Sequence, residues 1–174
     1  MCKKIILLGY MGSGKTVVAS KLSKVFKKKH LDLDVLIETQ QGLSISLIFK
    51  NKGELYFRKL EHVFFKELIE SDDEFILSLG GGTPCYANNH LLLQNKEDVV
   101  SIYLKTSVEE LCRRLVKEQS TRPIIAQMNK EELKEFIAKH LFDRNYYYHQ
   151  AKHVVLTDGK STEEIVKEIQ LLIA

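Results

Sequence analysis

Five short apolar runs alternate along the chain with longer segments of helical pattern. The runs cover residues 5–8, 31–35, 75–79, 99–104 and 153–156. They are mostly continuously apolar, which is typical of strands that are buried on both faces of a parallel sheet. The helical patterns cover residues 15–28, 44–50, 54–70, 107–118, 129–147 and 161–173. The alternation predicts an α/β fold of three layers, a five-stranded parallel sheet flanked by helices, with ligands at the carboxyl ends of the strands.

Three of the predicted helices begin with a capping signal. Ser107, Asn129 and Ser161 each stand three residues before a glutamate. In a capping box the two side chains satisfy each other's free backbone N–H groups, so this spacing predicts where each helix begins.

The composition narrows the class of protein. The chain has 174 residues, 44% of them hydrophobic, which suits one domain with a real core. Its 26 basic and 23 acidic residues nearly balance, which argues against a nucleic-acid-binding protein held by a basic stripe. Three widely spaced cysteines without a CxxC motif indicate neither a disulfide framework nor a zinc site. Without a membrane-length apolar stretch or a signal-peptide cleavage site, we expect a soluble cytoplasmic protein.

Residues 9–16 match the GxxxxGK[ST] motif of a phosphate-binding loop. The motif stands in the context it requires, after the strand at 5–8 and before the helix at 15–28. Its glycines let consecutive backbone N–H groups point at phosphates, and the helix N-terminus adds partial positive charge. Lys15 is expected to reach the β- and γ-phosphates of a nucleoside triphosphate, and the Thr16 hydroxyl is expected to bind Mg²⁺. The predicted nucleotide-binding residues of the loop are Gly12, Ser13, Gly14, Lys15, Thr16 and Val17.

A GTPase switch is one alternative for a chain with this loop. Residues 95–98 read Asn-Lys-Glu-Asp, as in the guanine-reading NKxD motif, but they precede a predicted strand and do not follow one. No aspartate in the sequence has a glycine three positions later, so the DxxG motif of a γ-phosphate switch is absent. We therefore treat the NKxD match as chance.

Asp32 and Asp34 end the second predicted strand. Because side chains alternate along a strand, both carboxylates are expected on one face, at the sheet edge where the phosphate loop opens. One of them could support Mg²⁺, and the other could accept a proton or a hydrogen bond from an acceptor hydroxyl. The alternative is a pair of solvated aspartates in a turn.

On a helix beginning near residue 54, Glu54, Arg58 and Glu61 share one face. The simpler interpretation of this face alone is an exposed helix with surface ion pairs. The functional interpretation is that the two carboxylates orient a guanidinium that binds an anionic substrate.

Two further features point to a ligand at the sheet edge. Gly80, Gly81 and Gly82 follow the third strand, where they leave room for a ligand to approach the backbone closely. The alternative is a sharp turn, for which one or two glycines suffice. Arg122 lies in a polar segment between helices that has the character of a lid, from which its guanidinium could reach the γ-phosphate.

Taken together, these motifs resemble the shikimate kinase family over nearly the whole chain. The family pattern has a phosphate loop, an Asp-x-Asp, a GExxFRxxE helix, a Gly-Gly-Gly turn, an Arg-Pro lid and a late arginine followed by a tyrosine and an alanine. In this sequence the late arginine is Arg144, and its tyrosine is Tyr147 or Tyr148. The glycine turn and the GExxFRxxE helix together are the most specific part of the match.

The resemblance implies a function and a role for each matched residue. The function is transfer of the γ-phosphoryl group of ATP, with Mg²⁺, to the 3-hydroxyl of shikimate in aromatic amino-acid biosynthesis. The implied fold is a five-stranded parallel sheet of the nucleoside-monophosphate-kinase type in one domain over residues 1–174, with a substrate-binding segment at about 33–62 and a lid at about 112–125. Many family members are monomers. The implied substrate-binding residues are Asp34, Arg58, Gly80, Gly81, Gly82 and Arg144. The resemblance also implies that Asp32 and Thr16 hold Mg²⁺, that Arg122 contacts the phosphates and that Arg114 lies near adenine. The implied catalytic residues are Lys15, Asp34 and Arg122.

Two rivals remain open at the level of sequence. Another small-molecule kinase with a phosphate loop, acting on gluconate or a nucleoside monophosphate, has the same loop. A nucleotide-dependent binding module would bind the nucleotide but show no turnover stimulated by an acceptor.

Overall fold

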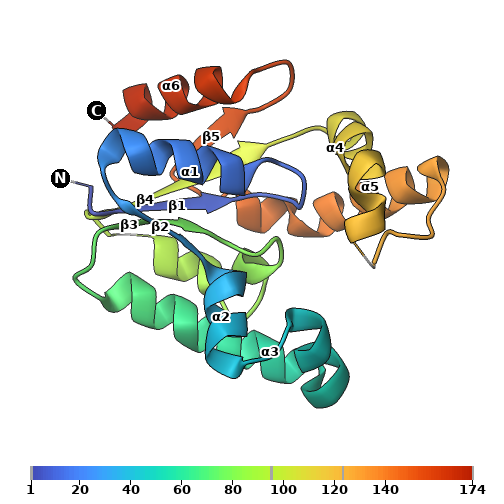
Figure 1. The fold of residues 1–174 in the computed structure, drawn as a ribbon. Coiled ribbons are helices and arrows are strands. Elements are labelled where there is room, and N and C mark those ends of the chain that lie inside the picture. Colours follow the sequence, from blue (N-terminus) through green and yellow to red (C-terminus); the bar gives the residue numbers. More distant parts are fainter. Residues whose placement is uncertain (1, 95, 123, 174) are drawn as a thin grey trace.

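The computed structural model describes residues 2–94, 96–122 and 124–173, and Figure 1 shows its fold. Asn95 of the NKxD-like run and Pro123 of the Arg-Pro pair lie outside the described residues. Among the helices that are described, none has both the length and the apolar character needed to cross a membrane.

The centre of the molecule is a five-stranded sheet in which all neighbouring strands pair in parallel. The strands are β1 (Lys4–Leu8), β2 (Lys29–Asp32), β3 (Phe75–Ser78), β4 (Val99–Lys105) and β5 (His153–Leu156). Their order across the sheet is β2-β3-β1-β4-β5. Because β1 lies between β3 and β4, the loops after these three strands open side by side at the carboxyl edge. The predicted parallel sheet of five strands is confirmed.

Helices cover both faces of this sheet (Figure 1). Residues of β1 alternate between two cores: Ile5 and Leu7 pack with α1 and α6, while Ile6 and Leu8 face the core that α3 and α5 share. This division gives the three layers that the sequence predicts. The α-helices are α1 (Lys15–Phe26), α2 (Leu33–Gln41), α3 (Ile45–Glu70), α4 (Val108–Leu115), α5 (Lys130–Tyr148) and α6 (Thr162–Ile173), and the short 3₁₀ helices are η1 (Thr83–Cys85), η2 (Asn89–Leu93) and η3 (Val116–Thr121).

The second strand and the segment after it differ from the prediction. We predicted a strand over residues 31–35, but β2 ends at Asp32 and helix α2 begins at Leu33. Asp32 is the N-cap of α2: its side chain accepts hydrogen bonds from the backbone N–H groups of Asp34 and Val35. An N-cap aspartate stabilises a helix start, and here that preference overrides the strand pattern of the apolar residues around it.

The other helix boundaries largely follow the sequence. The predicted helices at 44–50 and 54–70 join into α3, which is interrupted at Gly53, where φ is 81° and the backbone is not helical. Asn129 and Ser161 form the predicted capping boxes with the glutamates three residues on. The Ser107 side chain caps α4, but the Glu110 carboxylate does not accept the second hydrogen bond of a capping box, because it pairs with arginines on the same helix.

Candidate active site

The phosphate loop connects β1 to α1 through three glycines with positive φ. Gly12 has φ 80° and Gly14 has φ 94°, a region that is unfavourable for residues with a β-carbon. Gly14 is the N-cap of α1, and within the described residues no side chain caps it. The first N–H groups of α1 are therefore available to an anion, and the helix dipole favours negative charge there.

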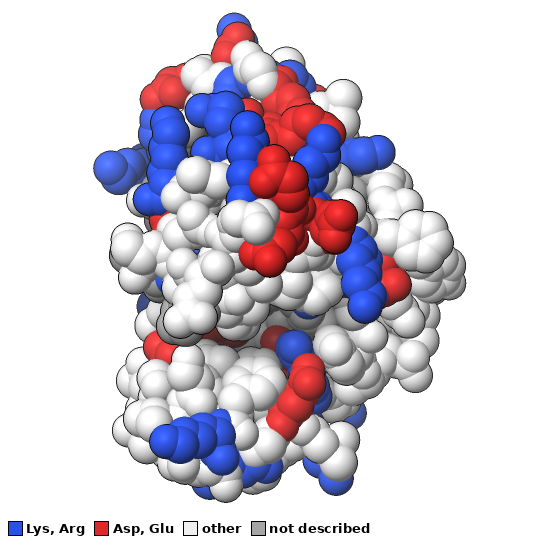
Figure 2. Space-filling view, turned by 90° about the vertical axis from the view of Figure 1, so that its right-hand side faces the viewer, with Lys and Arg blue, Asp and Glu red and all other residues white. Residues whose placement is uncertain are grey.

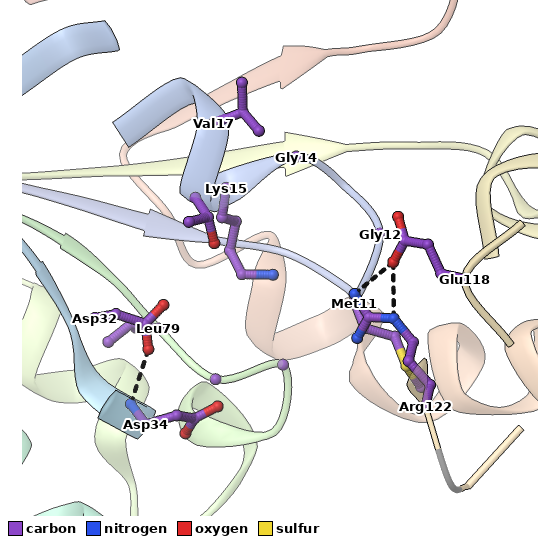
Figure 3. A pocket seen from close by; sticks show the side chains of 13 residues that line it. Met11, Gly12, Gly14, Lys15, Val17, Asp32, Asp34, Leu79, Glu118 and Arg122 are labelled. Atoms are coloured by element: carbon purple, nitrogen blue, oxygen red, sulfur yellow. Dashed lines mark hydrogen bonds and ion pairs between the residues drawn. The ribbon is translucent and has the colours of Figure 1, made fainter. Parts of the chain in front are cut away.

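Lys15 crosses the mouth of this loop. Its Nζ donates to the carbonyl oxygens of Gly9 at 2.8 Å and Tyr10 at 2.9 Å. In Figure 3 the Lys15 side chain extends into the pocket that Asp32 and Asp34 also line. Burial lowers the pKa of Lys15 to about 8, and the two aspartates oppose that shift. The structure thus directs a positive charge into the place where phosphates would lie.

Ser13 differs from the other predicted loop residues in its position. It is buried, its backbone N–H donates to the Tyr10 carbonyl at 3.2 Å, and its hydroxyl has no hydrogen-bond partner among the described residues. A β-carbon placed on Gly9 would lie 2.9 Å from that hydroxyl. The Ser13 side chain therefore fills the space beneath the loop and does not line the cavity described below.

Asp32 and Asp34 lie together, although not through the strand geometry that we predicted. Asp32 ends β2, Asp34 lies in the first turn of α2, and both line the same cavity as Lys15. Burial, together with the charges of Asp32 and Glu61, raises the pKa of Asp34 to about 6, and Lys15 opposes the rise. The alternative of two solvated turn aspartates is wrong, because both belong to an ordered helix start at the cavity.

The residues predicted to hold Mg²⁺ fit that ion. Thr16 and Asp32 line the same cavity, and their side chains carry a hydroxyl and a carboxylate. Hard oxygen donors suit Mg²⁺, which usually keeps water and phosphate ligands and needs only one or two from the protein. Among the described residues there is no group of three or more His, Cys, Asp or Glu side chains that could hold a metal ion.

Arg58 lies on α3 and is held by carboxylates on its own helix. Its Nη1 donates to Glu61 at 2.9 Å and its Nε to Glu54 at 3.3 Å. The guanidinium also lies over the Tyr86 ring, 4.1 Å from the centroid. The Glu61 side chain is only 1% exposed and that of Arg58 only 15%. The interpretation as an exposed surface ion pair is therefore wrong for Arg58 and Glu61.

The glycine turn after β3 is the point where these groups meet. A β-carbon on Gly82 would lie 2.8 Å from the Arg58 guanidinium, and one on Gly81 would lie 3.4 Å from that of Arg144. A β-carbon on Gly80 would lie 3.0 Å from an Asp34 carboxylate oxygen. Each glycine of the turn thus makes room for one predicted substrate-binding side chain, which a simple sharp turn does not require.

Arg144 comes from α5 and packs against the phosphate loop. Its guanidinium lies 5.4 Å from the centroid of the Tyr10 ring, an arrangement that favours a cation. Tyr148, one turn further along α5, is buried and donates a 2.6 Å hydrogen bond to the Gly81 carbonyl. This contact identifies Tyr148, and not Tyr147, as the tyrosine that meets the glycine turn.

Arg122 and Arg114 lie on the other side of the phosphate loop. Arg122 follows η3, lines the cavity and pairs with Glu118 at 2.7 Å (Figure 3). Arg114 on α4 donates to the Gly12 carbonyl at 3.1 Å and pairs with Glu110 at 2.7 Å. It lies against the loop but is not among the residues that line the cavity.

The cavity has a volume of about 300 Å³ and opens at the carboxyl edge of the sheet. Figure 2 shows this face of the molecule hollowed between the segment of α3 below and the segment of α4 and α5 above, with charged side chains in the hollow. Its lining includes Met11, Leu79 and Glu118, which the sequence analysis did not single out. Met11 and Leu79 gave no chemical signal because they are apolar residues beside glycines. The full lining is Met11, Gly12, Gly14, Lys15, Thr16, Val17, Asp32, Asp34, Leu79, Gly80, Gly81, Glu118 and Arg122.

Comparisons with known proteins agree with this geometry. A family model described as shikimate kinase matches residues 11–174. A shikimate kinase of Flavobacterium johnsoniae is 55% identical over 172 residues, which cover 99% of each chain. The crystal structure of a shikimate kinase from Bacteroides thetaiotaomicron has a TM-score of 0.89 at 30% identity and covers 98% of this chain and 97% of that one. A shikimate kinase from Acinetobacter baumannii, solved in complex with shikimate, has a TM-score of 0.86 at 30% identity and covers 99% and 93%. The fold is therefore that of the P-loop kinases related to nucleoside-monophosphate kinases.

Proposed function

The chain belongs to the shikimate kinase family, and from that premise we propose how its side chains share the work of the reaction. The protein is an ATP-dependent kinase that phosphorylates shikimate, a step of aromatic biosynthesis. Phosphoryl transfer depends mainly on alignment and on neutralisation of charge, so each role below is one of these two.

On the nucleotide side, the backbone N–H groups at the start of α1 hold the phosphates of ATP. Lys15 supports this assignment, because its ammonium points into the cavity beside those groups. Thr16 and Asp32 would hold Mg²⁺, directly or through water, and the ion would supply positive charge that neutralises the phosphates of ATP. Arg114 braces the loop through the Gly12 carbonyl and stays the residue that we expect nearest to adenine.

On the acceptor side, Arg58 and Arg144 bind the shikimate carboxylate. The observation that carries this proposal is the glycine turn, around which the guanidinium groups of both arginines and the carboxylate of Asp34 converge. A planar guanidinium binds a carboxylate through two parallel hydrogen bonds, and two such groups on separate helices define its direction. Segment 33–62, which carries Asp34 and Arg58, is in this proposal the acceptor-binding part of the chain.

Asp34 holds the acceptor 3-hydroxyl and takes its proton at a carboxylate oxygen. Its place at the cavity supports this role, because it faces Lys15 and borders the glycine turn. The raised pKa, about 6, makes its ionised form a better proton acceptor than an ordinary aspartate while leaving it mostly ionised at neutral pH.

Arg122 contacts the γ-phosphate from the lid, segment 112–125. Its position at the cavity wall supports a role in neutralising the charge that develops during transfer. Closure of this segment would also keep water from competing with the acceptor hydroxyl.

The acceptor specificity is tested by measuring ADP release with shikimate, gluconate and nucleoside monophosphates in one coupled assay. We expect turnover only with shikimate. Turnover with another acceptor at a comparable kcat/KM would contradict the assignment of the acceptor side, and nucleotide binding without any acceptor-stimulated turnover would indicate a binding module.

The physiological state of the protein stays a prediction. We expect a cytoplasmic monomer whose partner is its small-molecule substrate, without membrane or nucleic-acid partners. Sedimentation equilibrium of the purified chain distinguishes a monomer from a dimer.

A further inference from the structure

A chain of buried polar side chains lies behind Arg58. The Glu61 carboxylate accepts from Arg58 Nη1 through Oε2 at 2.9 Å and from the Thr83 hydroxyl through Oε1 at 2.6 Å. The Glu61 side chain is 1% exposed, and Thr83 is fully buried. The carboxylate is thus fixed at both oxygens, one by the predicted substrate-binding arginine and the other by a threonine that no motif singled out.

Thr83 is itself held firmly. Its backbone N–H donates to the Gly80 carbonyl at 3.1 Å, and its own carbonyl accepts from Asn89 Nδ2 at 2.8 Å. The Oδ1 atom of Asn89 lies 2.7 Å from Nδ1 of His62, the residue after Glu61 on α3. The contacts therefore close a ring from α3 through the 3₁₀ helices η1 and η2 and back to α3.

The location of the Thr83 hydroxyl gives this ring a connection to the site. A β-carbon on Gly80 would lie 3.0 Å from the Thr83 hydroxyl oxygen, 3.3 Å from Glu61 Oε1 and 3.0 Å from Asp34 Oδ1. The hydroxyl therefore lies in the wall directly behind the groups assigned to the acceptor, and it does not reach the cavity itself.

We propose that Thr83 is a positioning residue for the acceptor: its hydroxyl fixes the Glu61 carboxylate, which in turn fixes the Arg58 guanidinium in the orientation that meets the substrate carboxylate. This inference rests on the proposed role of Arg58. Without the hydroxyl, Glu61 Oε1 is a buried acceptor with no donor among the described residues, and the carboxylate is free to rotate towards another partner and take Arg58 with it.

Two substitutions separate the hydroxyl from the shape of the side chain. Thr83→Val keeps the branched volume and removes the donor, whereas Thr83→Ser keeps the donor and removes a methyl group. We expect Thr83→Val to raise the KM for shikimate by about tenfold to a hundredfold, the effect of losing a hydrogen bond to a charged group. The KM for ATP should change by less than about twofold, and Thr83→Ser should restore most of the shikimate KM.

A matched control is available at Thr106, which is also buried and whose hydroxyl makes a 2.6 Å bond with that of Thr157; the two residues directly follow β4 and β5. Thr106→Val removes a comparable bond away from Arg58. We expect both valine variants to lower the thermal unfolding temperature, but only Thr83→Val to raise the shikimate KM. Equal shikimate KM values for the two variants would overturn the proposal.

The double variant Thr83→Val with Arg58→Ala tests the route of the effect, with shikimate affinity measured by calorimetry. If Thr83 acts through Arg58, adding Thr83→Val to Arg58→Ala changes the affinity by less than about twofold. The same loss in both backgrounds would overturn the proposal. If the single variant Arg58→Ala binds shikimate with unchanged affinity, the proposed role of Arg58 is contradicted. If Arg58→Ala loses shikimate affinity but Thr83→Val does not, only the role of Thr83 is contradicted. If Thr83→Val does not fold, Thr83→Ala carries the same comparison.

Discussion

Two arginines at opposite ends of the site are held in very different ways. Arg58, on the proposed acceptor side, has a side chain that is 15% exposed, and it pairs with Glu61, which is 1% exposed. Arg122, on the proposed lid, is 37% exposed, and its partner Glu118 is 44% exposed. Both pairs have good hydrogen-bond lengths, 2.9 and 2.7 Å. The difference between them therefore lies in burial.

That difference separates a preorganised region from an adjustable one. A buried ion pair with further hydrogen bonds holds one geometry, because breaking it leaves an uncompensated charge out of water. An exposed i,i+4 pair contributes only about 0.5 kcal/mol and can exchange partners readily. Arg58 is thus suited to hold a substrate before reaction, whereas Arg122 is free to leave Glu118 for a phosphate.

The largest effect on kcat should come from Asp34, which we place between the acceptor side and the lid. Asp34→Asn removes the proton acceptor while keeping the size of the side chain, so we expect kcat to fall by about 10²–10⁴-fold. Binding of ATP, measured by calorimetry, should change little. A variant that retained more than a tenth of kcat would show that Asp34 only orients the hydroxyl.

The two carboxylates that hold the arginines offer the sharpest contrast. Glu61→Gln removes the charge that orients Arg58, and we expect the shikimate KM to rise by roughly tenfold or more. Glu118→Gln makes the matching change in the lid and should alter kcat and both KM values by less than about threefold. Steady-state kinetics on both variants measure this. Similar losses in the two would remove the distinction between a preorganised and an adjustable region.

A smaller effect concerns stability. The pKa of Asp34 is raised from 3.8 to about 6, so between these pH values the folded protein keeps a proton that the unfolded chain has lost. The free energy of unfolding contributed by this group therefore falls as the pH rises from about 4 to about 6, and it stays low above that range.

Asp34→Asn lacks this titration. We expect the variant to be more stable than the natural protein by about 3 kcal/mol at pH 7.5 and to lose that advantage near pH 4, as measured by urea unfolding. Asp72→Asn is the control, because the Asp72 side chain is fully exposed and distant from the site. Equal stability of Asp34→Asn and the natural protein at both pH values would show that the Asp34 carboxyl is not perturbed.

The parts of this site that the sequence predicts are those with a local signal. The phosphate loop and the capping boxes at Asn129 and Ser161 depend on residues a few positions apart, so spacing alone reveals them. The strand predicted over residues 31–35 was too long at its end, because an aspartate after an apolar run suits both a strand end and a helix N-cap. Tertiary structure decides between these two roles for Asp32. The mistake moved a boundary but still left both aspartates at the cavity.

The supporting groups could not be predicted in this way. The bond between Thr83 and Glu61 joins residues 22 positions apart, and nothing in the type of either residue requires it. The burial of Glu61 was likewise hidden, because a Glu-x-x-x-Arg-x-x-Glu face is also typical of an exposed helix. Sequence thus predicts the groups that we propose touch ligands, whereas packing determines how firmly each of them is held.

The most direct test of this account is a comparison of Arg58→Ala with Arg122→Ala in the same coupled assay, varying shikimate and ATP separately. We expect Arg58→Ala to raise the shikimate KM by at least about tenfold with little change in the KM for ATP, and Arg122→Ala to lower kcat by about 10²-fold or more with a smaller effect on shikimate. An unchanged shikimate KM in Arg58→Ala, or an effect of Arg122→Ala confined to nucleotide affinity, would contradict the division between a preorganised acceptor side and an adjustable lid.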